Sequence, residues 1–259
     1  MDCARFSRVV LMGFAVANPD QSMGFTLVPD DECRPHPDHD GRIPPFDGSL
    51  RVPLGHRMRA GKDLGEQRVP PAEFRQDPSG EIHLPVPRPW RLTEAMFSFG
   101  SGDPKATGLL RLGVPRRLNR HRAVVHAVVA LKRPLREEEV NDLHAIGLDE
   151  VLLLSPGQDG KPFGWPFAYP GLVGGFDAFG SPGSTSRTAE FRRWVSLLQP
   201  QDAPALKRLG LDLPELRRRA GEGLVHGFTV ISSPGVLEHM AKNPKARSVS
   251  LVDVVPEIR

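Results

Sequence analysis

The sequence predicts an α+β fold, and three observations lead to that prediction. Residues 224–255 read as an apolar strand, a short helix and a second apolar strand. A unit with the same order of elements begins at residue 123, and helical sequence lies between the two units. Two such units in one sheet make a split β-α-β, ferredoxin-like layer, because their crossovers are right-handed. We therefore expect a ferredoxin-like domain over residues 121–259 with a helical insertion at about 186–222, packed with an irregular β-rich region over residues 1–120.

The N-terminal region is expected to hold loosely organised β structure. Residues 5–17 and 23–28 are interpreted as two strands joined by an Asn-Pro turn. Short extended pieces recur at residues 50–54, 81–86 and 109–114, separated by Gly, Pro and charged residues. Pro85, Pro87 and Pro89 exclude a central strand there, because each proline removes a backbone donor.

Residues 1–17 also fit a signal peptide. Two arginines precede a short apolar run, and Ala15-Val16-Ala17 has the small-x-small form of a cleavage site. The apolar run is barely long enough for that function, and no stretch approaches the roughly 20 apolar residues of a membrane span. We expect a chain without a membrane span that is cytoplasmic by default, and this segment leaves secretion open as the alternative.

The first strand-helix-strand unit has clear sequence signals. Residues 123–132 are a nearly uninterrupted Val/Ala run, as in a strand that is buried on both faces. Pro134 opens a helix whose first turn carries three consecutive glutamates at 137–139, where acidic side chains suit the helix dipole. Residues 151–154 form the next strand. The insertion then carries its apolar residues at the spacing of one buried helix face: Phe191, Trp194, Val195 and Leu198.

Composition excludes several classes of function. The net charge of +3 is too small to argue for a nucleic-acid partner, and the 123–132 strand offers no aromatic ring on which RNA bases could stack. Cys3 and Cys33 could form at most one disulfide and no thiolate metal site. No standard glycine-rich phosphate loop is present. We expect no cofactor, and the oligomeric state is left open.

One histidine-rich loop is a candidate metal site. His36, His39 and Asp40 lie close together in a polar stretch, and imidazole and carboxylate groups suit a divalent metal that activates water. Pro37 opposes a helix that would align the two imidazoles. A solvated polar loop is the simpler interpretation, and a metal-dependent hydrolase is the alternative that these residues leave open.

An aromatic, glycine-rich stretch at residues 157–183 is the candidate binding surface. Its aromatic residues are Phe163, Trp165, Phe167, Tyr169 and Phe176, followed by Phe179. Such rings are favoured where proteins meet, although several should be partly buried over an edge of the core. We expect Trp165 and Tyr169 to be the first contacts of a protein partner.

The C-terminal half resembles the C-terminal domain of sigma factor regulators, the extracytoplasmic portion of certain membrane anti-sigma factors. The similarity lies in the strand 125–131 with Lys-Arg-Pro-Leu after it, the glycine- and proline-rich loop, and the closing segment from Gly227 to Val252. The resemblance implies a non-catalytic regulatory or sensing module that binds a protein or a ligand. The chain lacks the N-terminal sigma-binding domain and the membrane span of those proteins, so direct sigma-factor binding is not implied.

The last unit is also similar to subtilisin propeptides and related peptidase inhibitors. Gly227-Phe228-Thr229, a short helix and residues 243–249 carry this resemblance. It implies a peptidase-inhibitor-like domain that presents its sheet and tail to a protease. This inhibitor remains a second alternative, and an enzyme is the less favoured class.

Overall fold

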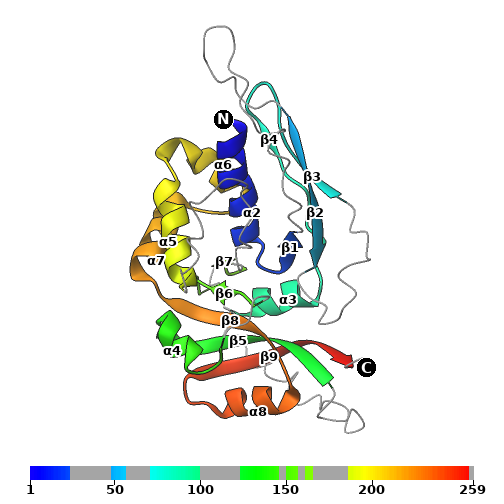
Figure 1. Ribbon diagram of the computed structural model, residues 1–259, viewed down its shortest axis with the longest axis vertical. Helices are drawn as coiled ribbons and strands as arrows, with labels where there is room; N and C mark the ends of the chain where they lie inside the picture. Colours follow the sequence, from blue (N-terminus) through cyan, green and yellow to red (C-terminus); the bar gives the residue numbers. More distant parts are fainter. Residues whose placement is uncertain are drawn as a thin grey trace.

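The computed structural model describes residues 1–23, 48–56, 71–99, 123–145, 150–156, 161–165 and 186–256. These residues form two antiparallel sheets with helices packed around them, which confirms the predicted α+β class (Figure 1). The larger sheet has the order β7-β6-β8-β5-β9, and the smaller has the order β1-β2-β3-β4. Within the described ranges, no helix is both long and apolar enough to cross a membrane.

The larger sheet is built around β5 (Ala123–Leu135). This strand pairs with β8 (Val225–Ser232) on one side and β9 (Ala246–Pro256) on the other, and both pairings are antiparallel. The short strands β6 (Leu152–Leu153) and β7 (Gly164–Trp165) continue the sheet beyond β8. Residues 125–131 of β5 are all buried, so the prediction of a strand covered on both faces is confirmed.

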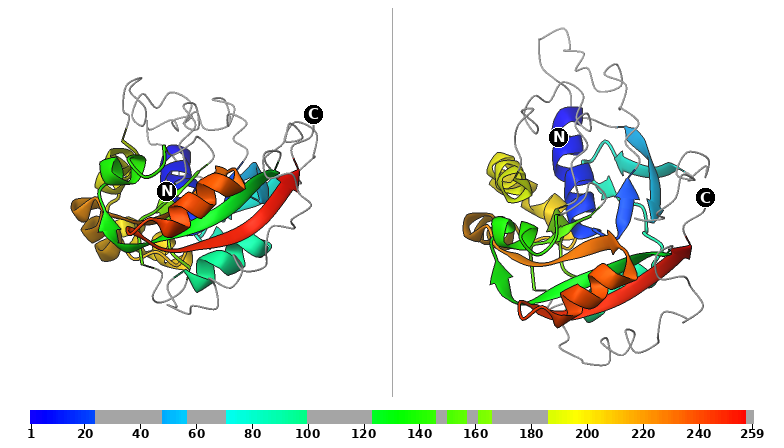
Figure 2. Two further views of the ribbon diagram at one scale, coloured as in Figure 1. Left: turned by 90° about the horizontal axis from the view of Figure 1, so that it is seen from below. Right: turned by 60° about the horizontal axis from the view of Figure 1, so that its bottom comes forward.

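Helices cover both faces of this sheet. Helix α8 (Pro234–Lys242) and helix α3 (Arg91–Ser98) lie on opposite sides of β5 and β9 (Figures 1 and 2). Alternate residues of β5 share core clusters with each helix, as the period of a strand requires. On the α8 side the buried residues include Val125, Ala127, Val129, Leu237 and Met240, together with Val140 of α4 (Glu137–Asn141). On the α3 side they include Leu92, Ala95, Met96, Phe99, Val128 and Ala130.

The N-terminal segment is a helix, and the predicted strand at residues 5–17 is wrong. Helix α1 (Cys3–Phe6), the π-helical turn η1 (Ser7–Leu11) and α2 (Met12–Ala17) follow one another without a break. In the wide turn, the Met12 N–H bonds the Ser7 and Val9 carbonyls, and the Arg8 carbonyl accepts the Trp194 indole N–H at 2.9 Å. Residues 9–16 are all buried in the core, so the segment interpreted as a signal peptide contributes to the packing of the fold.

The smaller sheet packs against this N-terminal helix. It consists of β1 (Gln21–Met23), β2 (Ser49–His56), β3 (Pro71–Gln76) and β4 (Ile82–His83). Phe14 of α2 meets Phe74 of β3 edge to face, with ring centroids 5.0 Å apart. Of the predicted strand at residues 23–28, Met23 ends β1 and the remainder lies outside the described residues.

In the described residues 186–224, four helical elements lead to β8. They are α5 (Arg187–Leu197), the 3₁₀ turn η4 (Pro200–Asp202), α6 (Ala203–Arg208) and α7 (Leu213–Glu222). Arg5 of the N-terminal helix bonds the buried Asp202 carboxylate through Nε at 2.9 Å and Nη2 at 3.0 Å. One continuous core cluster holds the N-terminal helix, the smaller sheet, the connecting helices and one side of the larger sheet together.

Candidate functional site

The structure describes two of the five aromatic residues proposed as a binding surface. Trp165 is 0% exposed, and Phe163 is partly buried against the core. Phe167, Tyr169 and Phe176 lie outside the described residues. The expectation that Trp165 is an exposed contact is therefore wrong. Its ring is enclosed because β7 joins the edge of the larger sheet directly beneath α5.

Trp165 belongs to an aromatic cluster with α5. Its ring centroid lies 5.6 Å from that of Phe191 and 5.8 Å from that of Trp194, and Phe163 lies 6.1 Å from Phe191. Tilted and edge-on pairs of this kind stabilise by about 0.5–1.5 kcal/mol each beyond the area they bury. The cluster fixes the chain at the end of β7.

The indole N–H of Trp165 is hydrogen-bonded to a carboxylate. The indole Nε1–H donates to Glu190 Oε2 of α5 at 3.3 Å. Burial raises the pKa of Glu190 above its ordinary value of 4.5, and the Glu137 charge acts in the same direction. The hydrogen bond from Trp165 and the charge of Arg187 oppose that rise without cancelling it.

Glu137 caps the beginning of α5. Although it sits in the first turn of α4, its buried carboxylate faces the other helix and accepts four hydrogen bonds. The donors are Ser186 Oγ at 2.9 Å, Arg187 N at 2.8 Å, Thr188 N at 2.9 Å and Thr188 Oγ1 at 2.8 Å. The first N–H groups of a helix have no partner inside the helix, and a carboxylate there also suits the helix dipole.

Arg187 ties the same helix to β6. Its Nη1 donates to the Glu150 carbonyl at 2.7 Å. The Glu150 carboxylate accepts the Ile231 N–H of β8 at 2.8 Å and lies 3.0 Å from His144 Nε2. Burial lowers the pKa of Arg187, and the charges of Glu137, Glu150 and Glu190 act against that effect.

We call Glu137, Trp165, Ser186, Arg187 and Glu190 the α5 anchor. It holds two points that are far apart along the chain, because Trp165 and Ser186 are separated by residues 166–185. Both points rest on the first turns of α5. The twenty residues between them therefore start and finish at one fixed place on the fold, and they include Phe167, Tyr169 and Phe176.

A second polar network fastens the segment that leads into β7. The Lys161 ammonium bonds Asn18 Oδ1 and Asp20 Oδ1, both at 2.8 Å, and Thr93 Oγ1 donates to Asp20 Oδ2 at 2.5 Å. Burial alone would raise the pKa of Asp20, but the charge of Lys161 and the hydrogen bonds to the carboxylate together lower it. This buried ion pair joins the end of the N-terminal helix, α3 and the approach to Trp165.

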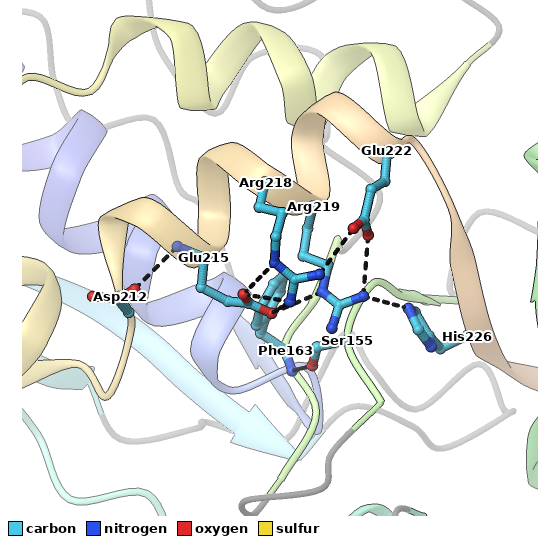
Figure 3. A network of polar contacts seen from close by, with 8 residues as sticks. All are labelled: Ser155, Phe163, Asp212, Glu215, Arg218, Arg219, Glu222 and His226. Carbon is cyan, nitrogen blue, oxygen red and sulfur yellow. Dashed lines mark hydrogen bonds and ion pairs between the residues drawn. The ribbon is translucent and has the colours of Figure 1, made fainter.

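A third network lies along α7 and reaches β8 (Figure 3). Glu215 pairs with Arg218 and Arg219, and Arg219 Nη1 lies 3.0 Å from His226 Nε2. Burial and the adjacent Arg219 charge lower the pKa of His226 to about 4, so the imidazole is neutral at physiological pH. The neutral ring accepts a hydrogen bond from the Arg219 guanidinium N–H, and this bond links α7 to β8. These groups stabilise the packing of α7 against β8.

The predicted metal ligands His36, His39 and Asp40 lie outside the described residues. Within the described part of the chain, Asp77, Glu81 and His83 form a group whose potential ligand atoms lie within 4.8 Å of one another. Asp77 accepts the Ser79 hydroxyl at 2.6 Å and the Glu81 N–H at 2.8 Å, and these hydrogen bonds lower its pKa to about 2. Glu81 pairs with Arg208 at 3.1 Å. These contacts close the turn between β3 and β4.

Comparison of the chain with protein-family models, curated proteins and solved structures finds no match. The function therefore has to be inferred from the α5 anchor itself. One indication of the α5 anchor was present in the sequence, because a buried tryptophan needs an acceptor for its indole N–H. The partnership of Glu137 with a helix fifty residues later has no local signal.

Proposed function

We propose that this protein is a non-catalytic regulatory module that binds a protein partner through the segment between Trp165 and Ser186. The α5 anchor is the observation that carries the proposal. Binding residues are commonly placed on loops that a rigid scaffold holds in position. Here both ends of one aromatic segment are attached at the start of the same helix by hydrogen bonds whose members Trp165 and Glu137 are buried.

The anchor divides the five aromatic residues into two roles. Phe163 and Trp165 hold the segment through their packing on α5, while Phe167, Tyr169 and Phe176 are proposed to make the contacts. This role fits a sensing domain of the kind found in sigma factor regulators.

We also propose that the larger sheet is a ferredoxin-like layer. Its support is the order β6-β8-β5-β9 with every neighbouring pair antiparallel. In this order β5, α4 and β6 make one strand-helix-strand unit, and β8, α8 and β9 make the other. The helices from α5 to α7 then form the insertion between the two units.

The peptidase-inhibitor alternative has less support. An inhibitor of that type presents a face of its sheet to the protease, and the face of this sheet opposite α8 is covered by α3. Leu92, Met96 and Phe99 pack there against Val128 and Ala130. The aromatic segment is therefore the better candidate for the working surface.

The proposal can be tested with peptides selected on the protein. The full chain would be used to select binders from a library of short random peptides, and the dissociation constant of one such peptide would be measured. An aromatic hot spot contributes about 2 kcal/mol, roughly 30-fold in Kd. We expect a loss of at least that size for the combined variant F167A, Y169A and F176A.

The matched control is Phe97→Ala, because Phe97 of α3 is 56% exposed and is not a residue of the α5 anchor. It should leave the affinity unchanged. An unchanged affinity in the combined variant, or an equal loss in Phe97→Ala, would contradict the proposal. The hydrolase alternative is separated by elemental analysis. A stoichiometric divalent metal that is lost on replacing His36 and His39 with alanine would favour it.

A further inference from the structure

We propose that the α5 anchor responds to pH: acidification protonates Glu190 and weakens its hold on Trp165. The regulatory meaning of this response rests on the proposed function, since Trp165 marks one end of the proposed binding segment. The response itself belongs to a contact between two described residues. It can be observed without any partner.

The three tryptophans differ in what their indole N–H groups meet. Trp194 donates to the backbone carbonyl of Arg8 at 2.9 Å, and Trp90 donates to the backbone carbonyl of Asp20 at 3.3 Å. Trp165 donates to a side-chain carboxylate. A backbone carbonyl does not titrate, so Trp165 is the tryptophan whose own acceptor changes charge with pH.

The charges around Glu190 favour uptake of a proton. Within the described residues, Arg187 faces it from α5 and Glu137 faces it from α4. Glu150, next to β6, shares Arg187 with both glutamates and has His144 as its own neighbour. The charges of three carboxylates thus act on one guanidinium, and Glu190 is the half-buried member of the three. Adding a proton to one of them relieves both their mutual repulsion and the cost of burying charge.

Glu190 is the member of this group that is free to accept that proton. The Glu137 carboxylate accepts four hydrogen bonds from the first turn of α5. Glu190 receives the indole N–H and no other hydrogen bond among the contacts of the described residues. Burial accordingly raises its pKa above the ordinary 4.5.

Protonation changes the strength of the Trp165 contact. An ionised carboxylate accepts a hydrogen bond that is roughly twice as strong as one to a neutral acceptor. The indole therefore bonds the stronger acceptor while Glu190 is ionised, and the weaker one once Glu190 is protonated. The attraction between Glu190 and Arg187 is lost in the same step. The Ser186 end of the anchor remains on Glu137, so the response concerns the Trp165 end.

The test is a pH titration of the ¹⁵N-labelled full chain, in which NMR follows the three indole N–H signals. Replacing each tryptophan in turn by phenylalanine assigns them. We expect the Trp165 signal to move with a midpoint above 4.5, while the Trp90 and Trp194 signals do not follow that midpoint. Glu190→Gln should abolish the movement. Glu138→Gln is the matched control, because Glu138 is an exposed neighbour on α4 and the same charge is removed.

Three results would overturn the proposal. They are a Trp165 signal that does not move, the same titration in Glu190→Gln, and a midpoint at or below 4.5. Failure of the binding proposal would appear in peptide affinities and would leave this titration unchanged. The two proposals can therefore fail separately.

Discussion

Replacing Glu137 with alanine should destabilise the protein strongly, although the residue lies in an ordinary first helical turn. Its carboxylate is the acceptor for the buried N–H groups of Arg187 and Thr188 and for two hydroxyls. Each buried donor that loses its acceptor costs about 1–3 kcal/mol. The two backbone donors alone therefore predict a loss of about 2–6 kcal/mol, a large part of the 5–15 kcal/mol that stabilises a typical domain.

The assay is urea unfolding followed by tryptophan fluorescence, since Trp194 belongs to α5 and the ring of Trp165 packs against it. Glu138→Ala serves as the control, and an exposed change of this kind should stay within about 0.5 kcal/mol. Glu137→Gln keeps one acceptor oxygen, so its loss should be intermediate and measurable even if the alanine variant is largely unfolded. Equal losses for Glu137→Ala and Glu138→Ala would refute the idea that Glu137 caps α5.

Three further predictions concern single residues. Folding raises the pKa of Glu190 above 4.5, so its ionised form opposes folding. Glu190→Gln should therefore increase the free energy of unfolding at neutral pH. This gain should vanish below pH 4.5, where the protonated Glu190 and the glutamine that replaces it are both neutral. The pKa of Asp20 is lowered in the folded protein, so its ionised form stabilises the fold above pH 3.8, and this stabilisation is lost as the pH falls through the folded-state pKa. Asp20→Asn should therefore cost about 3–5 kcal/mol of unfolding free energy at neutral pH and progressively less in acid. Unfolding curves at several pH values would show this. A methyl group at Gly227 would collide with the Phe99 ring, so Gly227→Ala should cost about 1–3 kcal/mol in thermal or urea unfolding, whereas Gly235→Ala, which enters open space on α8, should not destabilise.

The elements with a clear period or a clear stop signal could be predicted from the sequence. The Val/Ala run became β5, Pro234 opens α8, and Asn243 ends that helix. Each of these signals is local, since it depends on a few neighbouring residues. The α+β class followed from them.

The N-terminal helix was missed because its sequence has no polar side. Residues 9–16 are buried all round, and a buried helix shows no amphipathic period. Trp194 adds a reason that the sequence could not supply, since its bond to the Arg8 carbonyl supports the π-helical turn.

The candidate site could be predicted only in part, because the contacts that bury its residues come from distant parts of the chain. Sequence composition drew attention to the aromatic stretch, but it could not separate Trp165, which is buried, from residues that meet a partner. The three glutamates at 137–139 were interpreted through the dipole of their own helix. Glu139 does bond the Arg136 N–H at 3.2 Å, while Glu137 turns to α5. That difference depends on where α5 lies, which is a long-range property of the fold.

The most direct test of the central claim is to place a photo-cross-linking amino acid at position 169 and, as the control, at position 97. Each full-length variant would be irradiated with a peptide selected on the unmodified protein. Our account predicts cross-linking from position 169, in the segment between Trp165 and Ser186, and none from position 97 on α3. Cross-linking from position 97 alone, or equally from both positions, would contradict it.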